Sequence, residues 1–134
     1  MRAEVIARHT TAAMGLTKPI ILVAVGGAPA GNRLARELGA DYRVLPARDG
    51  LDVVFQYERL SGQVVAVVVD AALRCLGVGV LAEWLHHIDP QLPIIILAGG
   101  ADEDVASLSD SPAVKVVTKP FGGRRLKALL DDLI

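Results

Sequence analysis

Hydrophobic residues fall in short runs that alternate with amphipathic stretches, and this alternation is the main structural signal in the chain. The runs predict five strands, at residues 20–25, 42–45, 64–70, 93–98 and 113–118. The run at 64–70 is the most apolar, with six consecutive apolar residues, five of them valine, closed by Asp70. Such a run is typical of a strand that is buried on both faces of a parallel sheet.

The stretches between these runs predict helices. The expected helices cover residues 29–38, 51–60 and about 79–87, a segment that begins at Asp102, and a C-terminal segment that follows Phe121. Gly39 suits the end of the first helix, and Pro90 follows the end of the third. In the third helix, the spacing of Trp84 with Leu81 and Ile88 predicts that the indole packs in the core.

Five β/α units with short connections predict an α/β fold. A doubly wound parallel sheet of five strands is expected, in the flavodoxin-like order 2-1-3-4-5, within a three-layer αβα sandwich. Five units are too few to close an eight-stranded barrel. Residues 1–18 show no clear period and are expected to form an N-terminal extension, which leaves residues 19–134 as one domain.

Composition narrows the functional classes. Hydrophobic residues make up 52% of the chain and the mean hydropathy is +0.44, which fits a sheet covered by helices on both sides. The formal net charge is -1 and the basic residues are scattered, so neither nucleic acid nor a membrane is an expected partner. Cys75 is the only cysteine, which excludes an intrachain disulfide and favours a reduced, cytoplasmic setting.

Asp70 is the strongest candidate for a functional side chain. In open α/β sheets, binding and chemistry gather at the carboxyl ends of the strands. A charge at the end of a buried strand is costly unless something compensates it. Asp70 is therefore expected to be a functional residue or the remnant of one.

These elements, in this order, resemble the receiver (CheY-like) domain of bacterial response regulators over residues 19–134. Asp70 matches the position of the phosphoacceptor at the end of the third strand, and Lys119-Pro120-Phe121 matches the family's Lys-Pro-Phe after the fifth. Residues 42–45 and 90–97 resemble the second strand and the approach to the fourth. The resemblance implies that Lys119 contacts the acceptor position, and a direct contact between Asp70 and Lys119 is expected.

Other positions depart from the family pattern. The two acids that hold magnesium in receiver domains fall on Gly26 and Gly27, the Thr or Ser that binds the phosphoryl group falls on Ala98, and the aromatic of the fifth strand falls on Val116. Magnesium prefers several oxygen ligands, usually with one or two carboxylates among them. We therefore expect no tight magnesium site, no other cofactor, and little or no phosphorylation of Asp70.

The favoured interpretation is a non-enzymatic, receiver-like module of a two-component phosphorelay that signals through protein–protein contacts. Its partner is expected to be another protein or an output domain. A homodimer is also possible, through the face formed by the helix from Asp102, the strand at 113–118 and the C-terminal helix. Two alternatives stay open: a working phosphoacceptor modified on Asp70, and a module that binds a small ligand or anion at its glycine-rich loops.

Overall fold

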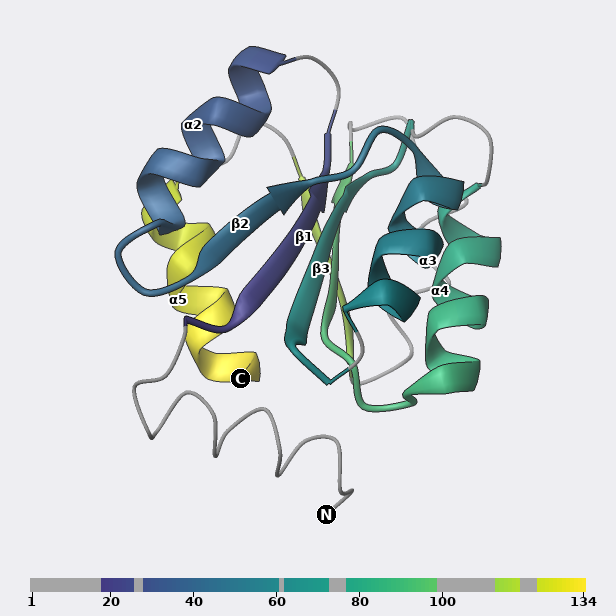
Figure 1. Cartoon of the computed structure of the whole chain (residues 1–134). Coiled ribbons are helices and arrows are strands. Elements are labelled where there is room, and N and C mark those ends of the chain that lie inside the picture. The colour runs from purple at the N-terminus through teal and green to yellow at the C-terminus, as the bar shows by residue number, and fades with distance from the viewer. Residues whose placement is uncertain (1–17, 26–27, 61, 73–76, 99–112, 119–122) are drawn as a thin grey trace.

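The computed structural model describes residues 18–25, 28–60, 62–72, 77–98, 113–118 and 123–134. Their strands form one parallel sheet (Figure 1). The strands are β1 (Ile20–Ala24), β2 (Arg43–Pro46), β3 (Val64–Asp70), β4 (Ile94–Ala98) and β5 (Val114–Thr118). They lie in the order β2-β1-β3-β4-β5, which confirms the predicted fold class and strand order.

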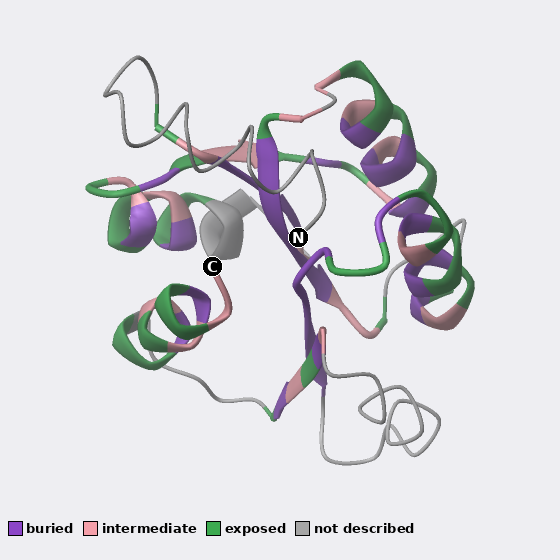
Figure 2. Cartoon of the chain, turned by 90° about the horizontal axis from the view of Figure 1, so that it is seen from below, coloured by how far each residue is buried: buried purple, intermediate pink, exposed green. Residues whose placement is uncertain are grey.

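The helices of the described residues lie on both faces of this sheet. They are α2 (Ala28–Leu38), α3 (Gly50–Arg59), α4 (Val78–Ile88) and α5 (Gly123–Leu133). Helices α2 and α5 cover one face, and α3 and α4 cover the other (Figures 1 and 2). No helix among these residues has the length and apolar character needed to cross a membrane. The helix predicted to begin at Asp102 lies outside the described residues.

The core consists of two layers, one on each side of the sheet. All residues of β1 and β4 are buried, as are the six apolar residues of β3. In β3, Val67 and Val69 pack toward α3 and α4, whereas Val68 packs toward α2 and α5. Burial on both faces explains why the sequence of β3 is apolar throughout instead of alternating.

The pairing of β1 with β3 contains one irregularity. Ile20 is paired with Val64, but Ile21 is paired with Ala66, so Val65 is an extra residue on β3. Val65 and Ala66 consequently contribute to the same core layer, under α2 and α5. An inserted residue of this kind bends and twists a strand locally.

Two glycines are required by the backbone where helices join strands. Gly62 lies in the turn between α3 and β3 and has a φ of 81°, a conformation that residues with a Cβ rarely adopt. Gly39 follows α2, and a Cβ atom at this position would lie 2.6 Å from the Ala35 carbonyl oxygen. Gly39 therefore ends α2, and Gly62 forms the turn that leads from α3 into β3.

The predicted core position of Trp84 is wrong. Trp84 is 42% exposed and Ile88 is 38% exposed. The buried face of α4 is formed by Val78, Leu81, Ala82 and Leu85. At 100° per residue, positions 84 and 88 lie on the flank of this face, so the sheet does not cover them.

Candidate functional site

Asp70 ends β3 at the edge where binding was expected. The six residues before it are buried, whereas Asp70 is only partly so. It is paired with Leu97 on β4, and the next backbone N–H, that of Ala71, donates to the Leu97 carbonyl at 2.9 Å. The Asp70 Oδ1 atom accepts a hydrogen bond of 2.9 Å from the backbone N–H of Ala72. This bond holds the carboxylate in the turn that follows the strand.

The neighbouring strands end at the same level. Ala24 of β1 is paired with Val69, so β1 ends one residue before Asp70 in the register. On the other side, Ala98 of β4 is paired with Thr118 of β5. The carboxyl ends of β1, β3, β4 and β5 thus lie along one edge of the sheet, as parallel pairing requires.

Three predicted site residues follow these strand ends in the sequence. Gly26 and Gly27 follow Val25, and Lys119 follows Thr118. All three lie outside the described residues. The expected contact between Asp70 and Lys119 therefore stays a prediction.

Ala98 and Val116, which the resemblance matches to the hydroxyl-bearing residue and the aromatic residue of receiver domains, are both aliphatic. Ala98 is 3% exposed and belongs to the layer under α3 and α4. Val116 on β5 is partly buried and packs against the same layer. Neither side chain offers a hydroxyl group or an aromatic ring, so neither can bind a phosphoryl oxygen.

Among the described residues, the donor set at this edge does not fit magnesium. Magnesium needs near-octahedral oxygen ligands, and protein sites usually supply one or two carboxylates. The last described residues of the β1 segment, Ala24 and Val25, are apolar, and glycines follow them. Nowhere in the described part of the chain do three or more His, Cys, Asp or Glu side chains gather as a metal site.

A second polar cluster joins α5 to the turn before β2, and sequence reasoning missed it. The Tyr42 hydroxyl donates a 2.6 Å hydrogen bond to Asp131 Oδ1. The Lys127 ammonium lies 2.8 Å from an Asp41 carboxylate oxygen and 3.4 Å from one of Asp131. Tyr42 and Asp131 are separated by 89 residues. No local sequence pattern signals such a contact.

The cluster shifts the titration of its members. Burial, and then the hydrogen bond to Asp131, raise the pKa of Tyr42 well above its usual value. The hydrogen bond from Tyr42 is the main cause that lowers the pKa of Asp131. The hydrogen bond to Asp41 is the main cause that raises the pKa of Lys127. Each shift favours the protonation state that the contacts require.

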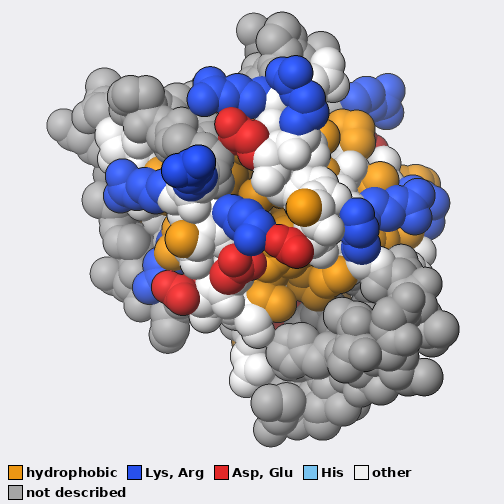
Figure 3. Space-filling model, turned by 90° about the vertical axis from the view of Figure 1, so that its left-hand side faces the viewer, with side chains coloured by type: hydrophobic (Ala, Val, Ile, Leu, Met, Phe, Trp, Pro, Cys, Tyr) orange, Lys and Arg blue, Asp and Glu red, His pale blue; other side chains and the backbone are white. Residues whose placement is uncertain are grey.

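Charge on this side of the molecule is mixed. Figure 3 shows basic and acidic side chains interspersed over the side that carries α2 and α5. Arg33 and Glu37 form an ion pair there at 3.3 Å, one helical turn apart. The described residues on this side therefore offer no surface of a single sign.

Comparison with known proteins gives a fold but no sequence family. The chain matches no protein-family model and no curated protein. Among solved structures, it is similar to a response regulator receiver domain protein from Clostridium thermocellum, with a TM-score of 0.79 and 21% identity over 87% of this chain and 94% of that one. A response regulator receiver protein from Sinorhizobium medicae gives a TM-score of 0.78 and 23% identity over 88% and 95%.

A third similar structure is a Francisella response regulator receiver domain, with a TM-score of 0.74 and 21% identity over 87% of this chain and 96% of that chain. These structures are similar to this chain over 87–88% of its length. The chain therefore has the fold of response regulator receiver domains. At these identities the likeness establishes the fold alone.

Proposed function

We propose that this chain is a receiver-like signalling module of a two-component system that works through protein–protein contacts without phosphorylation of Asp70. The observation that carries the proposal is the set of residue types at the positions that the resemblance assigns to the phosphorylation site. Gly26 and Gly27 stand where receiver domains carry acids, and Ala98 stands where they carry a hydroxyl. The acceptor position is kept, while the groups that would assist it are not.

The chemistry explains why these losses matter. Transfer of a phosphoryl group to a carboxylate brings two anions together, and a divalent ion neutralises their repulsion. Glycine offers only backbone carbonyls as ligands, which bind magnesium more weakly than carboxylates do. Ala98 is 3% exposed and ends in a methyl group, so it cannot donate a hydrogen bond to a phosphoryl oxygen.

In this proposal the module is not an enzyme, it resides in the cytoplasm, and its partner is another protein or an output domain. One structural neighbour supports an output domain as the partner. The similarity to NtrX from Brucella abortus has a TM-score of 0.75 but covers only 27% of that chain, so the same fold is one part of a longer protein there. The face that includes β5 and α5 is the contact surface we propose, either for a partner or for a homodimer.

Phosphorylation can be tested directly on the purified chain. After incubation with acetyl phosphate and magnesium, intact-protein mass spectrometry is expected to show no added phosphoryl group. Thermal unfolding is expected to be unchanged by magnesium with beryllofluoride. The variant Asp70→Asn is the control, because it cannot form an acyl phosphate. A phosphoryl adduct on the native chain that is absent from Asp70→Asn would overturn the proposal in favour of a working phosphoacceptor.

Restoring the missing acids tests the placement of the metal positions. The double variant Gly26→Asp/Gly27→Asp is expected to gain magnesium binding in titration calorimetry, because two carboxylates would then join Asp70. The matched control is Gly26→Asn/Gly27→Asn, which has similar side-chain volumes without charge. If circular dichroism shows a folded Asp variant and magnesium still binds no better than to the control, the assignment of positions 26 and 27 is wrong.

A further inference from the structure

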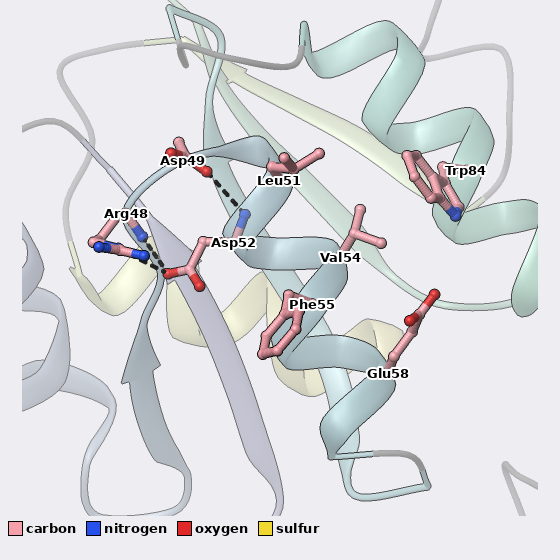
Figure 4. A pocket seen from close by; sticks show the side chains of 8 residues that line it. All are labelled: Arg48, Asp49, Leu51, Asp52, Val54, Phe55, Glu58 and Trp84. Atoms are coloured by element: carbon pink, nitrogen blue, oxygen red, sulfur yellow. Dashed lines mark hydrogen bonds and ion pairs between the residues drawn. The ribbon is translucent and has the colours of Figure 1, made fainter.

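A groove with a volume of about 500 Å³ lies between α3 and α4, and Asp70 is not among the residues that line it. Its apolar lining includes Leu51 and Phe55 of α3 and Trp84 of α4. These side chains are 55%, 68% and 42% exposed, respectively. Figure 4 shows Trp84 opposite the side of α3 that carries Leu51 and Val54.

The apolar surface continues along α4 beyond the groove. Val80, Trp84 and Ile88 recur every four residues, and Val80 is 54% exposed. Such residues form a line about 12 Å long on one side of a helix. The exposed side of a surface helix is normally polar, and clustered apolar residues there indicate a binding surface. An extended line of this kind suits a helix better than it suits a compact small molecule.

The charges around the groove are mainly negative. Asp49, Asp52 and Glu58 line it, against the single basic residue Arg48. The Arg48 guanidinium lies 3.8 Å from Asp52, which offsets one carboxylate. Within the described residues, Glu58 makes no ion pair.

The acids among the lining residues thus give the groove a mainly acidic rim. A basic partner would be complementary to this rim. If a second copy of the chain bound through the same groove, the carboxylates of the two copies would instead face and repel one another.

We propose that the α3–α4 groove binds an amphipathic helix of a partner protein, with apolar residues on one face and lysine or arginine residues beside them. The apolar face of that helix would pack against Phe55 and Trp84, and its basic residues would lie near Glu58. Asp70 does not line this groove, so the inference goes beyond the proposed function and does not depend on whether Asp70 is phosphorylated.

The chain contains a suitable probe of the groove. Trp84 is the only tryptophan, so its fluorescence reports on the groove alone. The probe ligand is a synthetic helix of about 18 residues with leucine on one face and lysine on the other. It is expected to shift Trp84 emission to shorter wavelength in a saturable way. The same peptide with glutamate in place of lysine is expected to have no effect.

Two groove variants and one control variant separate groove binding from general electrostatic attraction. Phe55→Ser is expected to weaken binding of the lysine peptide about tenfold, because it removes an exposed apolar anchor. Glu58→Lys is expected to weaken it by several fold. Asp132→Lys, which changes net charge equally on the exposed part of α5, is expected to leave it nearly unchanged.

Three results would overturn the proposal. The first is equal binding of the lysine and glutamate peptides, or binding of neither. The second is an equal effect of Glu58→Lys and Asp132→Lys. The third is self-association of the native chain, measured by sedimentation equilibrium and abolished by Phe55→Ser, which would assign the groove to a second copy.

Discussion

The Tyr42 side chain is nearly buried, but its hydroxyl group binds a carboxylate that is about half exposed. Tyr42 is 6% exposed and the side chain of Asp131 is 47% exposed. A hydrogen bond to an ionised acceptor stabilises more than a neutral one, although competition from water reduces its value. The ion pairs of Lys127 are exposed and contribute less. The Tyr42–Asp131 bond is therefore the main polar link between α5 and the turn before β2.

Removing this hydroxyl should destabilise the protein measurably. Tyr42→Phe keeps the buried ring and is expected to lower the free energy of unfolding by about 1 kcal/mol. The corresponding fall in Tm is about 3 °C for a chain of this size. Chemical denaturation measures the first value and calorimetry the second. Lys127→Met serves as the comparison, and a larger effect for Lys127→Met than for Tyr42→Phe would contradict this ranking.

At the level of secondary structure, α3 depends on its first turn. Asp49 is the N-cap, and its Oδ1 atom accepts a 2.8 Å hydrogen bond from the backbone N–H of Asp52. Asp52 in turn accepts a 2.8 Å bond from the backbone N–H of Arg48. Both bonds satisfy backbone donors that the helix itself cannot pair, and an acid at this end also suits the helix dipole.

The cap gives a prediction for α3. Asp49→Ala is expected to lower the free energy of unfolding by about 1 kcal/mol, because it leaves the Asp52 N–H without its acceptor. Asp49→Ser, which keeps a capping oxygen, is expected to retain most of the stability. Urea denaturation followed by circular dichroism measures both variants. Equal losses in the two variants would show that the capping bond does not stabilise α3.

The elements were predictable where one local pattern sufficed. The strand predicted at 64–70 matches β3, since six apolar residues followed by a charge define both its burial and its end. The predicted helix at 79–87 differs from α4 by one residue at each end. Trp84 was misplaced because periodicity identifies a helix but does not show which flank its neighbours leave uncovered. For the same reason, the sequence did not predict the groove between α3 and α4, which Trp84 lines.

For the whole molecule, strand order followed from the alternation of elements, while contacts across the fold did not. Short β/α connections and right-handed crossovers leave few possible topologies, and the observed order is the simplest of them. The position of Asp70 at the sheet edge follows from that order. The link between Tyr42 and Asp131 could not be inferred, because it joins two polar side chains from distant elements that carry no shared pattern.

This link makes the stability of the whole molecule depend on pH at both extremes. The lowered pKa of Asp131 means that its contribution is present above the ordinary carboxyl pKa and is lost as pH falls through the lowered value. The raised pKa of Tyr42 means that its contribution is present below the ordinary phenol pKa, near pH 10, and is lost as pH rises toward the raised value.

The difference in stability between the native chain and Tyr42→Phe should therefore depend on pH. It is expected to be constant between about pH 6 and pH 9, and to shrink below about pH 4 and above about pH 10. Urea denaturation of both proteins across this range measures the difference at each pH. The pKa of Lys127 is also raised, so its contribution to stability is lost at high pH as well. This loss occurs in both proteins and largely cancels from the difference between them. A difference that stays constant down to about pH 3 would mean that ionised Asp131 is not the acceptor that makes the bond stabilising.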